Sequence, residues 1–359
     1  MSFTAVAAAE LMQQLDRFDT IIDARSEDEF ALDRLPGAVN WPTLDNRERR
    51  EIGTIYKQVN PFEARKRGGA IAARNIGNHI ERHVLDKPRD WKPLTYCWRG
   101  GQRSGALSLV LSQIGFRVSV VEGGYRAFRA ALVADTARLA SGLRYQVVCG
   151  TTGSGKTRLL GALARAGAQV LDLEALASHR SSVLGAVPGQ PQPSQKGFDT
   201  RVWDVLRGFD PGRPVYVESE SRKVGNVAVP VALMDAMRQS SCLNLVLGDT
   251  ERVALLMEDY DFFVRDVESL CARLDVLSEL RGKAVVQGWK TSLRLGRIEA
   301  VVQELLTQHY DPGYRQSTRR NFTRFDEARL LEPPDRSDAA MDTLARKLLD
   351  NAAAPVTEA

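Results

Sequence analysis

Two short segments of the chain combine residue types that could bind phosphate-like groups. In the first, Cys97-Trp98-Arg99-Gly100-Gly101-Gln102-Arg103-Ser104, a thiol stands in a stretch whose backbone N–H groups can curl around an anion. The second, Gly150-Thr151-Thr152-Gly153-Ser154-Gly155-Lys156-Thr157, matches the complete Walker A pattern of a phosphate-binding loop. Together they predict chemistry that joins a cysteine handling sulfur or selenium to a diphosphate site.

The cysteine loop follows an apolar, strand-like run, and a helix is expected to begin near Ser104. Gly100 and Gly101 allow the backbone to turn its amides inward, and such a nest at a helix N-terminus stabilises a thiolate and bound anions. Arg99 and Arg103 add fixed positive charge. A single cysteine at a strand end is usually a buried hydrophobic residue, but the two glycines and two arginines favour a reactive thiolate at Cys97.

The Walker loop lies between an apolar strand and a helix-like stretch, which is the context that its motif requires. Lys156 would reach terminal phosphates, and Thr157 would ligate Mg²⁺. The candidate phosphate-binding residues are Gly150, Gly153, Ser154, Gly155, Lys156 and Thr157.

Acidic and basic side chains follow the next two predicted strands. Because ligands of an open parallel sheet bind at the carboxyl ends of its strands, we expect these side chains to face the Walker loop. Glu218 could equally be a helix cap or part of an ion pair. The candidates are Asp172, Glu174, His179, Arg180, Glu218, Glu220 and Arg222. His79 and His83 have a zinc-like spacing but no evident third ligand, so we predict no metal site there.

The length and composition of the chain are those of an ordinary globular protein with two domains, since 359 residues can bury two cores. The four cysteines form no CxxC pair, which favours neither a disulfide framework nor a zinc knuckle. We expect Cys149, Cys242 and Cys271 to be buried and inert. The chain start does not read as a signal peptide, and no apolar run is long enough to span a bilayer, so the cytoplasm is the expected location.

Basic residues gather in clusters although the net charge is only +4. The cluster Arg315, Arg319, Arg320 and Arg324 is interleaved with aromatic residues, a mixture that can hold phosphates and stack bases. A solvated basic face is the alternative. The interleaved aromatic residues are Tyr310, Tyr314, Phe322 and Phe325, and smaller basic clusters occur at Arg47, Arg49 and Arg50 and at Arg65, Lys66 and Arg67.

Alternation of apolar strands with helical stretches predicts an α/β fold in both halves of the chain. In the first domain, residues 1–135, we expect strands at 20–23, 94–97 and 117–121 and helices at 62–84 and 104–114. After a linker over 136–144, a second α/β domain over 145–250 would use strands at 145–149, 169–172, 215–218 and 243–247.

Beyond residue 250 the apolar spacing becomes helical, which predicts a helical, basic subdomain over 251–335. Residues 336–359 would form a tail that is partly disordered. Residues 187–197 are rich in Pro and Gln, and are expected to form a loop that could close over a site.

The cysteine loop and three further segments resemble a rhodanese domain. These segments are Asp23-Ala24-Arg25 followed by Glu29-Phe30, Leu35-Pro36-Gly37-Ala38-Val39-Asn40, and Val121-Glu122-Gly123-Gly124-Tyr125. Five residues separate Cys97 from Arg103, as in rhodanese-related phosphatases and unlike single-domain sulfurtransferases. The longer loop favours a wider pocket for selenophosphate or an ordinary phosphate ester over thiosulfate.

A rhodanese domain fused to a P-loop domain resembles the bacterial tRNA 2-selenouridine synthases, and the likeness extends from about Ile21 to Tyr314. Besides the two loops, it rests on Gly53 to Gln58, Pro61 to Lys66, Asp172 to Glu174, Gln192 to Lys196, Glu218 to Lys223 and Tyr310 to Pro312. His179-Arg180-Ser181-Ser182 stands where we expect the motif His-Arg-Gly-Ser.

The resemblance implies a transferase that acts on wobble 2-thiouridine of tRNA in two stages. Geranyl diphosphate first alkylates the sulfur, and selenium from selenophosphate then replaces the geranylthio group, which leaves more readily than the free thiocarbonyl. No tightly bound cofactor is expected, although Mg²⁺ could accompany the diphosphate. We expect the enzyme to act as a monomer without a membrane partner.

Charge and size suggest a role for each part. Cys97 would handle selenium or the departing thiolate, while Arg99 and Arg103 bind the phosphate end of selenophosphate. Lys156 and Thr157 would hold the diphosphate of geranyl diphosphate and stabilise it as it leaves. The basic segment Arg315 to Arg324 would position the anticodon arm.

Two other functions stay open from the sequence. One is a bifunctional enzyme that combines a P-loop phosphotransferase or ATPase with a rhodanese-type sulfurtransferase or phosphatase. The other is a nucleotide-gated binding protein with two degenerate loops, against which the intact Cys97, Lys156 and Thr157 argue.

Overall fold

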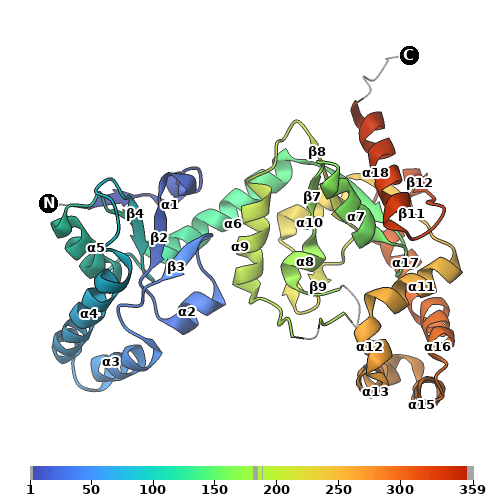
Figure 1. Cartoon of the computed structure of the whole chain (residues 1–359), viewed down its shortest axis with the longest axis horizontal. Helices are drawn as coiled ribbons and strands as arrows, with labels where there is room; N and C mark the ends of the chain where they lie inside the picture. The colour runs from blue at the N-terminus through green and yellow to red at the C-terminus, as the bar shows by residue number, and fades with distance from the viewer. Residues whose placement is uncertain (1–2, 181–184, 188, 354–359) are drawn as a thin grey trace. The chain divides into compact units, whose positions relative to one another are not determined.

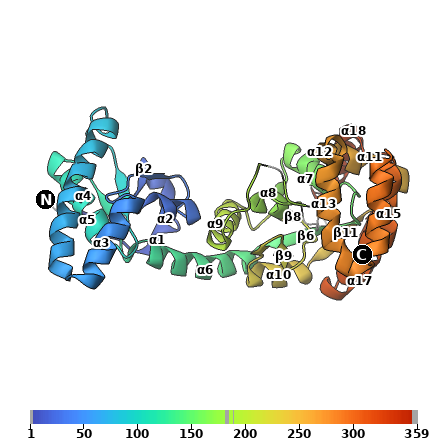
Figure 2. The same ribbon diagram turned by 90° about the horizontal axis from the view of Figure 1, so that it is seen from below.

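The computed structural model describes residues 3–180, 185–187 and 189–353. These residues form two compact α/β units, which confirms the predicted fold class (Figures 1 and 2). The first unit contains residues 1–138 and 193–204, and the second contains residues 139–192 and 205–359.

The first unit is built on a five-stranded parallel sheet in the order β1-β5-β4-β2-β3. Its strands are β1 (Thr4–Val6), β2 (Thr20–Asp23), β3 (Ala38–Asn40), β4 (Pro93–Tyr96) and β5 (Ser119–Val121). Strand β4 is central, and all four of its residues are buried, as expected for a parallel strand covered on both faces. The cysteine loop therefore leaves the sheet at its middle.

Helices surround this sheet (Figures 1 and 2). Two long helices follow β3 in the sequence and pack against each other. Helices α3 (Asn46–Gln58) and α4 (Pro61–His83) each begin at a capping side chain, Asp45 and Asn60. Helix α4 also packs against α5 (Gln102–Ile114). The other elements are α1 (Ala8–Leu11), η1 (Leu15–Arg17), α2 (Glu27–Leu32) and α6 (Gly124–Gly142).

Helix α9 (Gln195–Leu206) corrects the loop predicted over residues 187–197, because its first turn begins at Gln195. Most of α9 belongs to the first unit. Arg129 of α6 donates to Asp199 at 2.7 Å, and the indole of Trp203 donates to Asp135 at 2.9 Å. Residue 188 of the predicted loop lies outside the described residues.

The second unit is built on another five-stranded parallel sheet, in the order β12-β11-β6-β8-β7. Strands β6 (Arg144–Cys149), β7 (Gln169–Leu171), β8 (Pro214–Glu218) and β11 (Ser241–Leu245) were all predicted. The edge strand β12 (Arg329–Leu331) was not, because only its last residue is buried. The region predicted to be helical over 251–335 therefore also supplies a strand. Strands β9 (Lys223–Val224) and β10 (Val227–Ala228) form a separate antiparallel pair.

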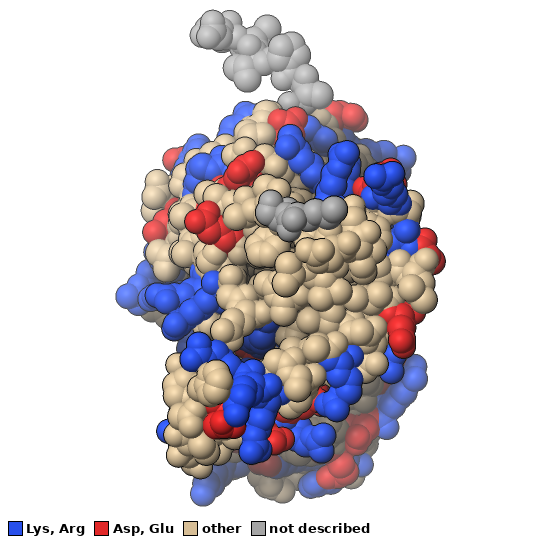
Figure 3. Space-filling view, turned by 90° about the vertical axis from the view of Figure 1, so that its left-hand side faces the viewer, with Lys and Arg blue, Asp and Glu red and all other residues tan. Residues whose placement is uncertain are grey.

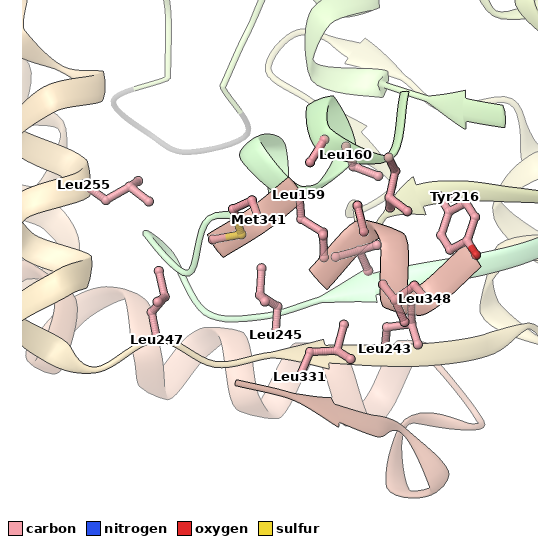
Figure 4. Close-up of a cluster of buried hydrophobic side chains, with 14 residues drawn as sticks. Leu159, Leu160, Tyr216, Leu243, Leu245, Leu247, Leu255, Leu331, Met341 and Leu348 are labelled. Atoms are coloured by element: carbon pink, nitrogen blue, oxygen red, sulfur yellow. The ribbon is translucent and has the colours of Figure 1, made fainter. Parts of the chain in front are cut away.

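The predicted tail is wrong for most of its length, because α18 (Asp338–Ala353) is part of the core. Figure 4 shows Met341 and Leu348 of this helix among Leu159, Leu245 and Leu331. Met341 is fully buried. Residues 354–359 lie outside the described range.

The predicted linker over 136–144 is also wrong, since α6 continues to Gly142 and β6 begins at Arg144. The helical character predicted over 251–335 is confirmed up to α17 and η4, and strand β12 is the exception. The helices of this region, with the other helices of this unit, are α7 (Lys156–Arg165), α8 (Leu173–Ala177), α10 (Val231–Arg238), α11 (Asp249–Asp259), α12 (Asp261–Arg265), α13 (Val267–Leu274), η2 (Asp275–Leu277), α14 (Ser278–Arg281), α15 (Lys283–Arg294), α16 (Ile298–Glu304), η3 (Leu305–Tyr310), α17 (Asp311–Asn321) and η4 (Phe325–Glu327).

All four cysteines are buried and free, as predicted for Cys149, Cys242 and Cys271. Cys271 packs in the core of the helical region with Leu274, Trp289 and Leu305. Among the described helices, none has the length and apolar character to cross a membrane.

Candidate functional site

The cysteine loop is held by close backbone packing against the turn between β5 and α6. Gly100 and Gly124 adopt φ values of +64° and +61°, and a Cβ on Gly124 would lie 2.3 Å from the carbonyl oxygen of Cys97. The amide of Tyr125 donates to that same oxygen at 2.8 Å. These contacts explain why glycines occur in both segments, since only glycine tolerates this approach.

The Cys97 thiol lies at the start of α5, and only 3% of the residue is exposed. Ser104, in the first turn of α5, donates its hydroxyl hydrogen to the Cys97 sulfur at 3.2 Å. The sulfur therefore lies beside a hydroxyl donor and near a helix N-terminus, and a reactive Cys97 stays a prediction.

Arg103 is engaged by Glu29, a partner that the sequence reading missed. Its guanidinium lies 2.7 Å from the Glu29 carboxylate, which also receives Arg49 at 3.0 Å. Burial opposes ionisation of Glu29, but the hydrogen bond and charge of Arg103 hold its pKa below the ordinary value. The side chain of Arg99 is exposed. Phosphate binding by Arg99 and Arg103 stays a prediction.

Helix α9 brings one further cation to the cysteine loop. The ammonium of Lys196 lies 5.8 Å from the centroid of the Trp98 ring, within the range of a cation–π contact. In the sequence, Lys196 stands out only as the end of the Gln192 to Lys196 motif. Its place could not be deduced, because the chain between Trp98 and Lys196 includes strands of both sheets.

The Walker loop follows β6, the central strand of its sheet, and leads into α7. Gly150, Gly153 and Gly155 all have positive φ, at +154°, +77° and +88°. Lys156 donates to the carbonyl oxygen of Gly150 at 2.7 Å. The predicted phosphate-binding residues thus come together, with the lysine folded over its own loop.

Tyr314 of α17 forms part of this loop's support rather than a stacking surface for bases. Its hydroxyl accepts from the amide of Gly150 and lies 2.7 Å from the hydroxyl of Ser219. Its ring lies under the Lys156 ammonium, 5.4 Å from the centroid. Burial raises the pKa of the Tyr314 phenol, so its hydrogen stays available for donation.

A buried ion pair supports the Walker loop at Thr152, two residues beyond the contact of Tyr314 with Gly150. Arg252 of α11 contacts Asp311 at 2.6 Å and donates to the carbonyl oxygen of Thr152 at 2.9 Å. Only 4% of Arg252 is exposed. This pair gives a structural role to Asp311 in the motif Tyr310 to Pro312, and the sequence reading missed Arg252 because no local pattern marks it.

Carboxylates gather where Thr157 leaves the loop. The Thr157 hydroxyl lies 3.4 Å from Glu174, and the amide of Glu174 donates to Glu218 at 2.8 Å. Burial, followed by the charges of Asp172, Glu220 and Glu174, raises the pKa of Glu218 well above its ordinary value. Burial likewise raises the pKa of Asp172.

This acidic group is suited to a cation. One carboxylate oxygen of the buried Glu218 finds no hydrogen-bond partner among the described residues. Within the same residues, no three His, Cys, Asp or Glu side chains converge as a complete metal site. A Mg²⁺ ion would therefore need oxygens from Thr157 and from a bound diphosphate as well.

The other predicted supporting residues are less closely grouped. Arg180 donates to the carbonyl oxygen of Asp259 and lies over the Tyr260 ring, at the edge of the Walker cavity. His179 is half-buried, and burial with the charge of Arg273 lowers its pKa. Arg222 is exposed. Ser181 and Ser182 lie outside the described residues.

The basic cluster near residue 320 is exposed, but its aromatic residues are not arranged for stacking. Arg319 and Arg320 lie on the exposed side of α17. Arg319 pairs with Asp326 at 3.5 Å, and Arg324 pairs with Glu327 at 3.1 Å. Phe322 is only 3% exposed, and Tyr314 lies at the Walker loop. The expected stacking surface is therefore wrong for these two rings. The side chain of Arg315 is outside the described atoms.

The smaller basic clusters lie exposed on α3 and α4. On the face that Figure 3 shows, Lys and Arg side chains form separate groups with acidic side chains between them. A surface of mixed charge is also typical of a solvated face that binds no nucleic acid.

Above the Walker loop lies a cavity of about 640 Å³. Its walls include Lys156, Thr157, Glu174, Arg180 and Tyr314, which come from separate parts of the second unit. The cavity has room for a diphosphate together with part of a larger substrate. Of the predicted supporting residues, Glu174, Arg180 and Glu220 line this cavity.

Fold and site together define a protein that couples a rhodanese-type cysteine loop to a P-loop α/β domain. A sequence model of the rhodanese-like domain matches residues 7–131. A second model, described as the tRNA 2-selenouridine synthase AAA domain, matches residues 143–273.

Relatives carry the same name. The chain is 31% identical to a tRNA 2-selenouridine synthase of Marinobacter nauticus, covering 82% of this chain and 87% of that protein. It is 35% identical to one of Nitrosomonas europaea over 67% of this chain, and the aligned region spans 63% of that relative's length. The chain therefore belongs to the tRNA 2-selenouridine synthase family. A rhodanese-related protein of Thermoplasma volcanium matches 35% of this chain and 90% of its own at 20% identity, with a TM-score of 0.24.

Proposed function

We propose that this protein is a transferase that replaces sulfur by selenium at the wobble 2-thiouridine of tRNA. The reaction would pass through an S-geranyl intermediate and use geranyl diphosphate and selenophosphate. The observation that carries the proposal is the presence of two intact anion-binding loops, one with Cys97 and one with Lys156 and Thr157, in a chain of this family. Each loop suits one of the two stages.

In the first stage, the thiouridine sulfur attacks the allylic carbon of geranyl diphosphate, and the bond from that carbon to the diphosphate oxygen breaks. The leaving diphosphate gains negative charge, which the Walker-loop amides and Lys156 would stabilise. Lys156 would exchange its contact with Gly150 for a phosphate oxygen. Thr157 and the carboxylates around Glu218 would hold Mg²⁺, which neutralises diphosphate charge when bound.

In the second stage, selenium adds to the carbon that carries the geranylthio group, and geranylthiolate leaves. Selenophosphate supplies the selenium, and its phosphorus ends as phosphate after taking up water. Cys97 would handle the selenium or the departing thiolate, with Ser104 hydrogen-bonded to its sulfur. Arg99, Arg103 and the loop amides would bind the phosphate end of selenophosphate.

The polynucleotide partner would be the anticodon arm of a tRNA in the cytoplasm, and the enzyme would act on it as a monomer. Arg319 and Arg320 offer exposed cations on α17, with Arg315 and Arg324 beside them in sequence. With Phe322 and Tyr314 directed elsewhere, these arginines would contact phosphates rather than stack on bases.

Two variants separate the two stages. Lys156→Ala should abolish geranylation of 2-thiouridine-containing tRNA, whereas Cys97→Ala should retain geranylation and lose selenium incorporation. Lys283→Ala, at an exposed position on α15, is the matched control and should change neither. Products are measured by nucleoside mass spectrometry. Normal geranylation by Lys156→Ala, together with loss of nucleotide binding, would contradict the assignment and favour a phosphotransfer function.

A further inference from the structure

A second cavity, of about 70 Å³, lies beside the Walker loop in the helical part of the second unit. Apolar side chains from α11, α12, α16 and η3 form most of its lining, including Leu256, Val264, Ile298, Val302 and Leu306. Its polar lining groups in the described part of the chain are one threonine and two tyrosine side chains. The cavity therefore suits a hydrocarbon group rather than a nucleotide base.

This apolar cavity adjoins the cavity above the Walker loop. Thr152, Leu256, Tyr260 and Tyr310 line both of them. Thr152 belongs to the phosphate loop itself, so the apolar cavity borders the phosphate-binding backbone. A ligand that fills both would carry phosphate at one end and an apolar chain at the other.

The cavity lies within the packed core of the helical region. That core contains Leu274, Trp289 and Leu293, and four of its members also line the cavity, namely Phe263, Leu270, Val301 and Leu305. Protein interiors normally leave few voids larger than a water molecule. An apolar cavity left in an otherwise packed core is therefore better explained by a ligand than by packing.

Local backbone geometry also marks the cavity wall. Residues Leu305–Tyr310 form a π-helical segment between α16 and α17. Such segments are rare and frequently occur at functional sites. Here the segment directs Leu305, Leu306 and Tyr310 to the lining of the apolar cavity.

We propose that this cavity binds the prenyl chain of an allylic diphosphate whose diphosphate lies in the Walker loop. The inference rests on the proposed function and assigns the substrate's apolar half to named residues. A volume of about 70 Å³ is well above the roughly 10–15 Å³ that one water needs, so the cavity admits part of a short prenyl chain and is too small for a long polyprenyl chain. Burial of such a chain would make geranyl diphosphate bind more tightly than inorganic diphosphate.

The test is a titration of the full chain with geranyl diphosphate and with inorganic diphosphate by calorimetry, in the presence of Mg²⁺. Val302→Phe fills the cavity from a partly exposed position and should weaken geranyl diphosphate binding by at least about tenfold. Its binding of inorganic diphosphate should stay as in the wild type. Val285→Phe, at a position 41% exposed on α15, is the matched control and should change neither ligand.

A second variant tests the cavity in the opposite direction. Leu306→Ala enlarges it and should shift preference from geranyl diphosphate toward the longer farnesyl diphosphate, which an unfolded variant cannot do. Wild-type affinity for geranyl diphosphate in Val302→Phe would overturn the inference. An equal loss of both ligands in a folded Val302→Phe protein would also overturn it, because the cavity would then act only by supporting the loop.

The proposed function is tested separately by Lys156→Ala. If this variant loses geranyl diphosphate while Val302→Phe retains it, the diphosphate assignment holds and the prenyl cavity is wrong. If Lys156→Ala binds geranyl diphosphate normally, the Walker-loop assignment itself is wrong.

Discussion

Replacement of Asp311 by Asn tests whether the buried ion pair beneath the Walker loop supports that loop. Arg252 contacts two carboxylates, Asp311 at 2.6 Å and Asp249 at 3.1 Å, and it also donates to the carbonyl oxygen of Thr152. The Asp311 side chain is 13% exposed, whereas that of Asp249 is 64% exposed. The two partners therefore provide a matched comparison around one guanidinium.

Burial sets the expected magnitudes. Removal of one partner from a buried pair costs about 3–5 kcal/mol, because the remaining charge is left uncompensated. Asp249 remains near Arg252 after the Asp311→Asn change, so we expect the lower end, about 3 kcal/mol. Asp249→Asn removes a solvent-screened partner and should cost less than about 1 kcal/mol.

The assay is urea unfolding of both variants and the wild type, monitored separately for each unit by hydrogen exchange. Asp311→Asn should lower the unfolding free energy of the second unit, leave the first unit unchanged, and weaken diphosphate binding because Thr152 loses its anchor. Equal losses for Asp311→Asn and Asp249→Asn would refute the reasoning. Wild-type affinity for diphosphate in the Asp311→Asn protein would also refute it.

Three further changes have defined outcomes. Tyr314→Phe should cost about 1–3 kcal/mol of unfolding free energy in urea, because the amide of Gly150 loses its acceptor; a loss no larger than at an exposed tyrosine would contradict this. Met341→Ala should cost about 2–5 kcal/mol, while Asn351→Ala on the exposed side of the same helix should change little, and similar values would show that α18 is not part of the core. Glu218→Gln should stabilise the Mg²⁺-free protein at neutral pH. The folded-state pKa of Glu218 is raised, so the neutral carboxyl group stabilises the fold fully below about pH 4.5, and this stability is lost as the pH rises through the folded-state pKa. Urea unfolding at about pH 4 and about pH 7 checks this, and an equal effect at both values would refute the raised pKa.

The sequence predicts the two sheets and both loops because their signals are local. Buried parallel strands such as β4 and β6 are short apolar runs, and the glycines around Cys97 and Lys156 mark backbone that must approach other backbone closely. These patterns need no knowledge of distant residues. The carboxyl-end rule for parallel sheets likewise anticipates Glu174 and Glu218 beside Thr157.

The features that the sequence does not predict depend on contacts between distant segments. Helix α18 has an ordinary amphipathic pattern, and only its packing on α7 shows that it completes the core. The basic neighbours of Tyr314 predict a base-stacking residue, yet the position of α17 directs its hydroxyl to Gly150. The ion pair of Arg252 with Asp311 spans 59 residues and leaves no periodic trace.

The same holds for the apolar cavity. Its lining residues, such as Val264 and Val302, have the helical spacing of ordinary core residues. Only the arrangement of α11, α12, α16 and η3 shows that they surround an open space next to Thr152.

The most direct test of the central claim is nucleoside mass spectrometry of 2-thiouridine-containing tRNA treated with the purified protein. Parallel samples contain geranyl diphosphate, selenophosphate, both or neither. We predict a geranylated nucleoside with geranyl diphosphate alone and a selenium isotope pattern when both reagents are present. Unchanged tRNA in every sample, from folded protein with reduced Cys97, would contradict the account and favour a phosphotransfer enzyme.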